Sequence, residues 1–230
     1  GWIASENGIN CNNGSSASYN WDTNVFSITS NNCYHADNTG SDQLAIAHFS
    51  LCGNSSITAQ VTSIGGSNLG WAGVIMRENS AAGAKKAQLM TNLSTLSRRE
   101  FRTTTNGSAI PQQFQSQNRY WLRITRTGNQ FVMYVSLNGL VWSPAGAQTI
   151  IMENCIDAGL VVTNYNANSM VTATFANVNL TGESMTLPKI ANEISSHSLA
   201  ENDISMVKIM PNPTFGKFEI DIKSAVSRSV

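Results

Sequence analysis

The chain has few charged side chains and no long apolar run. Charged residues make up 12% of its 230 residues, about half of the ~25% that is usual. Fourteen Lys and Arg balance fourteen Asp and Glu, so no net charge is available to hold nucleic acid or an anionic membrane. No stretch approaches the ~18 apolar residues of a membrane-spanning helix. We therefore expect no nucleic-acid partner and no transmembrane segment. Because Gly1 does not begin an export signal, we also expect that the chain is a mature or trimmed form.

Residue clusters typical of catalysis and metal binding are also missing. The four cysteines include no C-x-x-C pair, and only three histidines are present, which argues against a zinc or redox site. Carboxyl groups are scarce, and no strand carries several of them on one face as a glycoside hydrolase requires. No Gly-x-Ser-x-Gly motif supports a serine nucleophile. These absences predict that the chain has no catalytic residues and is not an enzyme.

Uncharged polar residues are abundant instead. The sequence contains 26 Asn, 28 Ser and 19 Thr, so uncharged hydrogen-bonding groups must form its surface. The 41% of hydrophobic residues is enough for a full core, which indicates one large domain or one domain with an appendage. This composition favours a protein that works outside the cell.

The number of cysteines is even, which in a secreted chain predicts two disulfides. Four cysteines allow three connectivities. We favour Cys11 with Cys33, which closes an Asn-rich loop, and Cys52 with Cys155, which ties an early segment to a late one. The alternative is that some of them are free buried thiols.

Nearly every regular segment alternates with period two, as β-strands do. We expect hairpin turns at 20–24, at 52–55 and at Asn138-Gly139, where Asn-Gly favours a type I′ turn, and a short alanine-rich link at 79–86. About a dozen strands without a long helix predict an all-β, two-sheet antiparallel sandwich. The expected strands are 16–19, 25–29, 44–51, 57–64, 72–77, 87–92, 100–105, 120–127, 130–137, 147–152, 157–164 and 172–180.

Most of the chain resembles a family of bacterial extracellular domains. The matching segments occur in the family's order: Trp71-Ala72-Gly73-Val74-Ile75-Met76-Arg77-Glu78, 82–87, 102–105, Tyr120-Trp121-Leu122-Arg123, 136–142, 158–163 and 173–178. They are similar to the concanavalin A-like, laminin-G-like jelly rolls related to the domain-of-unknown-function 1349 group. The resemblance implies a jelly roll at 1–184 but no particular reaction. Cys33-Tyr34-His35 replaces a Trp that the family commonly has.

The C-terminal part carries a second resemblance. Two prolines make Pro211-Asn212-Pro213 a stiff extended bend, Gly216 suits a turn, and alternating strands flank both. The pattern resembles the start of the type A sorting domain of Bacteroidetes type IX secretion cargo, which normally continues beyond the length present here. We expect a linker at 185–204 and the first strands of a small β-sandwich at 205–230, with Pro211, Asn212, Pro213 and Gly216 as the sorting signal.

Several side chains are candidates for binding. Sugar sites combine an aromatic platform with amide hydrogen bonds, which favours Trp71, Tyr165, Asn164 and Asn166. We interpret Trp121 and Trp142 as core residues because both lie in alternating strands. The pair Arg77-Glu78 either contacts a ligand at the rim or, as we favour, forms an ion pair at the edge of the core. No cofactor is expected, although Asp37 and Asp42 could bind calcium.

Together these patterns predict a secreted or cell-surface, non-catalytic, adhesive or carbohydrate-binding module exported by the type IX system. Its partners would be the translocon, the outer-membrane shuttle, and glycans or neighbouring surface proteins. Two alternatives remain open, a structural subunit of a surface assembly and an accessory or degenerate domain of a glycoside hydrolase.

Overall fold

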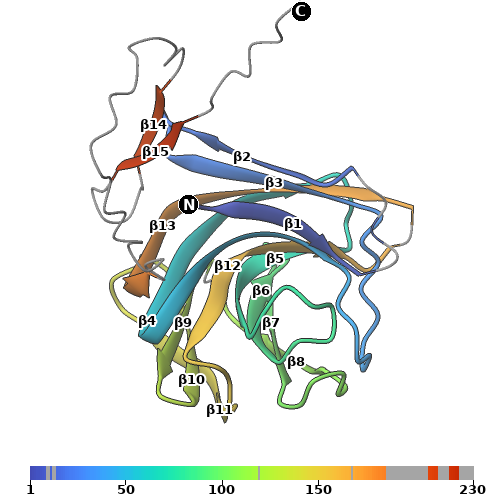
Figure 1. Ribbon diagram of the computed structural model, residues 1–230. Helices are drawn as coiled ribbons and strands as arrows, with labels where there is room; N and C mark the ends of the chain where they lie inside the picture. The colour runs from blue at the N-terminus through green and yellow to red at the C-terminus, as the bar shows by residue number, and fades with distance from the viewer. Residues whose placement is uncertain are drawn as a thin grey trace, which may run out of the picture. The chain divides into compact units, whose positions relative to one another are not determined.

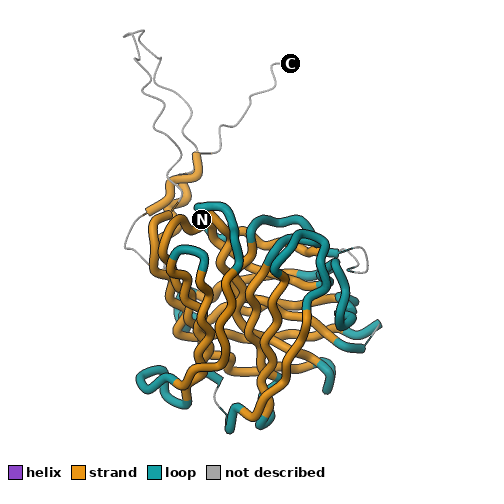
Figure 2. Tube along the Cα trace, turned by 90° about the horizontal axis from the view of Figure 1, so that it is seen from below, coloured by secondary structure: helices purple, strands orange, loops and turns teal. Residues whose placement is uncertain are grey.

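The computed structural model describes residues 1–8, 11, 14–118, 120–166 and 168–184, and the backbone of 207–211 and 218–222. The chain divides into two compact units, one of residues 2–185 and one of residues 186–230 with Gly1. Every regular element in the described part is a β-strand, as Figure 2 shows. Accordingly, no described helix is long and apolar enough to cross a membrane.

The larger unit is an antiparallel jelly-roll sandwich, as the sequence predicts. Its strands form one hydrogen-bonded network that folds into two layers because β4 belongs to both. Sheet I has the order β1, first half of β4, β12, β5, β6, β7, β8. Its strands are β1 (Ile3–Asn7), β4 (Leu44–Gly65), β12 (Cys155–Asn164), β5 (Gly70–Arg77), β6 (Lys86–Thr91), β7 (Leu96–Arg102) and β8 (Ile110–Gln115).

Sheet II has the order β2, β3, β13, second half of β4, β9, β10, β11. Its additional strands are β2 (Ser16–Asn20), β3 (Val25–Asn31), β13 (Met170–Ser184), β9 (Trp121–Thr127), β10 (Gln130–Ser136) and β11 (Ser143–Thr149). The β2–β3 hairpin pairs as expected, and β9 and β10 form a further hairpin. The sequence did not predict β1 or β8, the two outermost strands of sheet I.

The hairpin predicted at 52–55 is wrong. Residues 44–65 form the single strand β4, which pairs with β12 at Cys52 and with β9 from Ser55 onward. Gly53, at φ 65°, lets the strand bend there, because residues with a β-carbon rarely adopt this conformation. Figure 1 shows β4 curving from its place beside β12 into the other sheet. Gly53, which we expected in a hairpin turn, is therefore the residue at which β4 passes from sheet I to sheet II.

The Asn138-Gly139 turn also differs from the prediction. Only Gly139 has positive φ, at 75°, so the turn is not type I′, which needs positive φ at both central residues. The Asn138 side chain instead accepts hydrogen bonds from the backbone N–H groups of Leu140 and Val141. This Asx arrangement shapes a longer loop, residues 137–142, between β10 and β11.

A single large apolar core lies between the sheets. Inward-facing residues of both layers fill it, because alternate side chains of each strand point the same way. Trp2 closes the core beside β1, with its ring 4.8 Å from Phe26 and 6.5 Å from Phe49 between centroids. A smaller cluster lies on the opposite, outer face of sheet I and includes Trp71 and Met90.

Two disulfides join the predicted partners. Cys11 pairs with Cys33, and Cys52 pairs with Cys155 across β4 and β12; no cysteine is free. The alternative of free buried thiols is thus wrong. Disulfides of this kind are typical of proteins that function outside the cytoplasm.

The smaller unit contains a two-stranded antiparallel sheet of β14 (Val207–Pro211) and β15 (Phe218–Ile222). The predicted linker at 185–204 lies outside the described residues, as do Asn212, Pro213 and Gly216 of the predicted sorting signal.

Candidate functional site

The outer face of sheet I carries an unusual set of buried charges. Cross-strand pairing places Arg77 of β5, Lys86 of β6 and Arg102 of β7 side by side. The same register puts Glu100 of β7 opposite Gln88 of β6. All five are 0–1% exposed. The segment before β4 covers this face with His35 and Asp42, and the loop before β6 covers it with backbone carbonyls that accept hydrogen bonds from Arg77 and Arg102.

Glu100 is the most heavily engaged carboxylate. Lys86 Nζ donates to its Oε2 at 3.0 Å, and Arg98 Nε donates to its Oε1 at 2.7 Å. His35 Nε2 lies 3.2 Å from both oxygens, and the Tyr165 hydroxyl donates to Oε1 at 3.3 Å. Both carboxylate oxygens are therefore occupied by protein donors.

Asp42 is the second buried carboxylate. Its Oδ1 lies 2.9 Å from Lys86 Nζ and accepts a hydrogen bond from Arg102 at 2.7 Å, while Oδ2 lies 3.5 Å from Arg77. Lys86 thus bridges the two carboxylates. We call Asp42, Arg77, Lys86, Arg98, Glu100 and Arg102, with His35, the buried charge network.

The network keeps both acids ionised. Burial alone would raise the pKa of Glu100, but Lys86, His35 and Arg98 hold it well below its usual value. Burial would also raise the pKa of Asp42, but the positive charges of Lys86, Arg102 and Arg77 lower it by more. Neither group can act as the protonated general acid of a glycoside hydrolase at neutral pH.

Two partly exposed carboxylates lie at the ends of the network. Asp37, with 46% of its side chain exposed, pairs with Arg98. At the other end Asp157 is 13% exposed and lies near enough to Arg77 for the two to shift each other's pKa. Four cationic side chains are thus balanced by four carboxylates, two buried and two at the surface.

Tyr165 covers the Asp37 end. The Arg98 guanidinium lies 4.7 Å from the centre of its ring. The rings of His35 and Trp71 meet it edge-on at 5.4 and 6.4 Å between centroids. Burial, and next the charge of Glu100, raise the pKa of Tyr165, so its hydroxyl stays a donor. Tyr165 as a whole is half-buried, and its hydroxyl lies near enough to Asp37 for that carboxylate to raise its pKa.

The four predicted binding residues come together but differ in exposure. Trp71 is 6% exposed, and Asn164 is fully buried. The Asn164 side chain holds its own loop, accepting from Ser67 at 3.1 Å and donating to the Asn166 carbonyl at 2.8 Å. Only Tyr165 and Asn166 offer surface. Trp71 and Asn164 therefore support the loop from below, and their role in binding stays a prediction.

Two other interpretations are corrected by the structure. Arg77 and Glu78 do not pair with each other, because Arg77 points into the network while Glu78 lies 2.7 Å from Lys85. Trp121 and Trp142 are half-buried and belong to neither apolar cluster. The guanidinium of Arg123 lies 3.9 Å from the ring centre of Trp142, so these rings lie on the outer face of sheet II. Period two indicates a strand but not which of its faces is covered.

A metal ion fits the network poorly. His35, Asp37 and Glu100 offer ligand atoms within 4.8 Å of one another, but Lys86 and Arg98 bind the same carboxylates. A cation there would meet two positive charges. Asp42, one of the two expected calcium ligands, is similarly surrounded by cationic groups.

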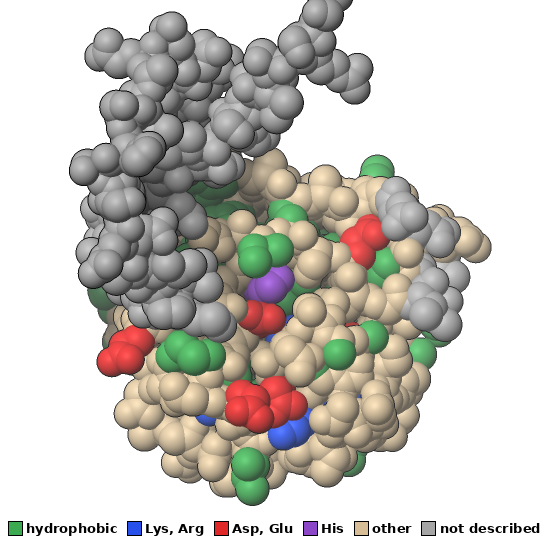
Figure 3. Space-filling view, viewed as in Figure 1, with side chains coloured by type: hydrophobic (Ala, Val, Ile, Leu, Met, Phe, Trp, Pro, Cys, Tyr) green, Lys and Arg blue, Asp and Glu red, His purple; other side chains and the backbone are tan. Residues whose placement is uncertain are grey.

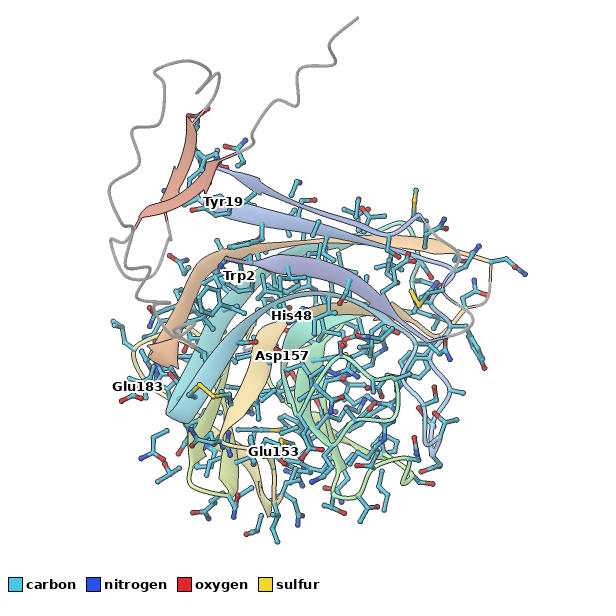
Figure 4. All side chains as sticks on the ribbon, viewed as in Figure 1. Trp2, Tyr19, His48, Glu153, Asp157 and Glu183 are labelled. Carbon is cyan, nitrogen blue, oxygen red and sulfur yellow. A yellow bond between two sulfur atoms is a disulfide. The ribbon has the colours of Figure 1, made fainter. Side chains whose placement is uncertain are left out.

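His48 and Asp157 lie close together where β4 pairs with β12 (Figure 4). The strand register also places Ser50 opposite Asp157. Ser50 donates to Asp157 Oδ1 at 2.7 Å, and His48 Nδ1 lies 3.4 Å from the same oxygen. Burial would raise the pKa of Asp157, but His48, Ser50 and Arg77 hold it below its usual value. In a catalytic triad the serine bonds to the histidine; here it bonds to the aspartate. The arrangement is therefore not a nucleophilic triad.

The surface around these groups is largely uncharged. In the view of Figure 3, neutral polar side chains and backbone cover most of the visible face, with scattered charged groups among them. Sequence reasoning missed the network, although Arg98, Glu100 and Arg102 alternate along one strand, which places all three on the same face.

Comparison with known proteins shows the fold only. No known protein family and no characterised protein sequence matches the chain. A functionally unknown protein from Saccharomyces cerevisiae is similar in structure at a TM-score of 0.57 and 13% identity, over 79% of this chain and 95% of that one. A lectin from Bauhinia forficata in complex with GalNAc has a TM-score of 0.40 at 10% identity, over 79% and 99% of the two chains. A Bacillus licheniformis β-glucanase has a TM-score of 0.41 at 8% identity, over 76% and 91%.

Proposed function

We propose that the protein is an extracellular, non-catalytic module that binds glycans at the surface formed by Asp37, Tyr165 and Asn166. One observation carries this proposal: the buried charge network holds a partly exposed carboxylate, Asp37, and the half-buried Tyr165 next to each other through Arg98 and Glu100. Sugar sites pair an apolar ring surface with a few fixed polar groups. Asp37 would accept hydrogen bonds from sugar hydroxyls, and Asn166 would donate and accept them.

The absence of catalysis and of a cofactor is part of the same proposal. The pKa values of Glu6, Asp42, Glu100 and Asp157 all lie below their usual values, whereas a glycosidase acid needs a raised one. In the described part of the chain, the group most like a metal site already holds two protein cations.

Glycan-array binding by the purified protein, followed by calorimetry on the best ligand, tests the proposal. Asp37→Asn and Asn166→Ala are each expected to weaken binding about tenfold, or ~1.4 kcal/mol. Asp22→Asn is the matched control, because Asp22 is exposed in the β2–β3 turn away from this surface. Binding that is the same in all variants would refute this site. A polysaccharide-cleaving activity lost in Asp157→Asn would instead favour a hydrolase, and a regular lattice of copies a structural subunit.

We also propose export by the type IX system, with its translocon and outer-membrane shuttle as partners. Pro211 ends β14, and Asn212, Pro213 and Gly216 follow it in the sequence before β15 begins; this order of strand, proline pair, glycine and strand supports the proposal, as do the two disulfides. In a host that has the system, replacing Pro213 and Gly216 by Ala in the full chain is expected to leave it in the periplasm. Unchanged delivery to the cell surface would contradict it.

A further inference from the structure

Four strands of the sandwich have one unpaired edge among the described residues. They are β1 and β8 of sheet I, and β2 and β11 of sheet II. An open edge presents free backbone N–H and C=O groups to which another strand can pair, and natural proteins usually protect such edges. The two sides of this sandwich differ in that protection.

The side formed by β8 and β11 is closed. Each strand contains a proline, Pro111 or Pro144, which removes a backbone donor. Arg99 bridges the two strands, donating to the Gln112 side chain of β8 at 2.6 Å and to the Ala145 carbonyl of β11. An added strand would have to displace this bridge.

The side formed by β1 and β2 is less protected by the residues that the structure describes. Neither Ile3–Asn7 nor Ser16–Asn20 contains proline, lysine or arginine. A cavity of about 290 Å³ lies between them, with Ala17, Ile28 and Ala45 among its apolar lining. This is nearly twice the roughly 150 Å³ that accommodates benzene in an engineered cavity, so it has room for one long side chain. Ser5, whose hydroxyl is buried without a hydrogen-bond partner, is also among the lining residues.

One charged group, Glu6, lines the cavity. Its Oε1 accepts hydrogen bonds from the backbone N–H groups of Gly14 and Ser15 at 3.3 and 2.7 Å. Burial would raise the pKa of Glu6, but these bonds hold it below its usual value, so it is ionised at neutral pH. An inward-facing charge excludes strands that are purely apolar, and it favours a strand with a positive charge.

We propose that the cavity between β1 and β2 binds an extended peptide strand of another protein, which pairs with the free edge of β2 and places one basic side chain against Glu6. Backbone pairing supplies affinity in such strand addition, and pockets for alternate side chains supply specificity. The apolar lining would cover the stem of a lysine or arginine while Glu6 binds its head.

A second copy of this chain fits less well. The described free edges of its sandwich are β1 and β2, which contain no basic residue, and β8 and β11, which contain a proline each. In its smaller unit β14 does contain a lysine, Lys208, but it also ends in Pro211 and already pairs with β15. Glu6 would then remain without a counter-charge in a closed interface, which is unfavourable. The charge of the cavity therefore favours a different chain as the occupant.

Three blocked heptapeptides of alternating Thr and Val test the proposal by fluorescence anisotropy. One has Lys at its central inward-facing position, one has Glu there, and one is the Lys peptide with methylated backbone amides. We expect the Lys peptide to bind, the Glu peptide to bind at least about tenfold more weakly, and the methylated peptide not to bind.

Two variants of the full chain locate the site. Ala17→Lys fills the cavity and pairs with Glu6, so it should weaken binding by about tenfold or more. Ser18→Lys is the matched control, because the next side chain on β2 points to the exposed outer face; it should bind as the natural protein does. Circular dichroism melting checks that both fold.

Three results would overturn the proposal. They are failure of the Lys peptide to bind, equal binding of the Lys and Glu peptides, or unchanged binding by a folded Ala17→Lys variant. Sedimentation showing a dimer that Ala17→Lys dissociates would assign the cavity to a second copy instead. All these readouts are independent of glycan binding at Asp37.

Discussion

Replacing Glu100 by Gln tests the buried charge network most directly. The substitution keeps the shape of the side chain but removes a negative charge that Lys86 and Arg98 contact at 3.0 and 2.7 Å. Both cations are buried, at 0% and 2% exposure. Breaking a buried ion pair by removing one partner costs about 3–5 kcal/mol, because the other charge is left uncompensated.

The control is Glu78→Gln. Glu78 also forms an ion pair, at 2.7 Å from Lys85, but these side chains are 11% and 20% exposed and water can replace the lost contact. A pair near the surface contributes about 0–1 kcal/mol. The two variants therefore compare the same chemical change at two depths.

Urea unfolding followed by tryptophan fluorescence measures both. With a urea dependence of about 3 kcal/mol per molar, a loss of about 3–5 kcal/mol moves the unfolding midpoint of Glu100→Gln down by about 1 to 1.7 M. The midpoint of Glu78→Gln should move by less than about 0.4 M on the same scale. Equal shifts in the two variants would refute the view that the network is buried and mutually dependent.

Three further outcomes follow from the structure. Replacing Cys52 and Cys155 by Ala should lower the free energy of unfolding by about 4.7 kcal/mol and replacing Cys11 and Cys33 by about 3.4, since chain-entropy loss grows with loop length and the loops span 103 and 22 residues; the reverse order in calorimetry would contradict this. Gly53→Ala should cost about 1 to 2 kcal/mol, because alanine is strained at the φ of 65° that Gly53 has. No clash adds to this cost, since the new β-carbon would meet no atom within 4 Å; a cost near zero in urea unfolding would show that φ 65° is not needed. The melting temperature should be steady at neutral pH and fall below about pH 4.5, because the pKa values of the two buried carboxylates are lowered in the folded state and their contribution is lost as they are protonated; stability that instead rises on acidification would contradict the sign.

Prediction of the fold succeeded where local patterns decide it. Alternation along segments such as 157–164 identified the strands, and the turn-rich stretch between β2 and β3 identified a hairpin. It failed at Gly53, where the same residue type permits either a reversal or a bend. Pairing of β4 with β12 and β9 settles that choice, and those partners lie about a hundred and about seventy residues away. The edge strands β1 and β8 were missed because an edge strand needs little hydrophobic pattern.

Prediction of the site succeeded less well for a similar reason. The sequence predicted Tyr165 and Asn166 as binding residues because an aromatic side chain is next to an amide, and both are at least partly exposed. It could not show that Trp71 is covered while Trp142 is half-exposed, because each strand has two faces and the alternation is the same for both. Which face is covered depends on loops from elsewhere in the chain, such as the one that carries His35 and Asp42 across sheet I.

The sequence by itself therefore determined most of the strands, the lack of net charge and the even set of cysteines, because these depend on composition and on neighbours along the chain. Only the tertiary structure decided which charges are buried together. The six acidic and basic side chains of the network come from positions between 42 and 102 on four separate segments. An isolated charge would be strongly disfavoured in that interior, and the same charge is stable when its partner from another strand lies within 3 Å. Tertiary contact, which the linear order of residues does not state, is what makes the difference.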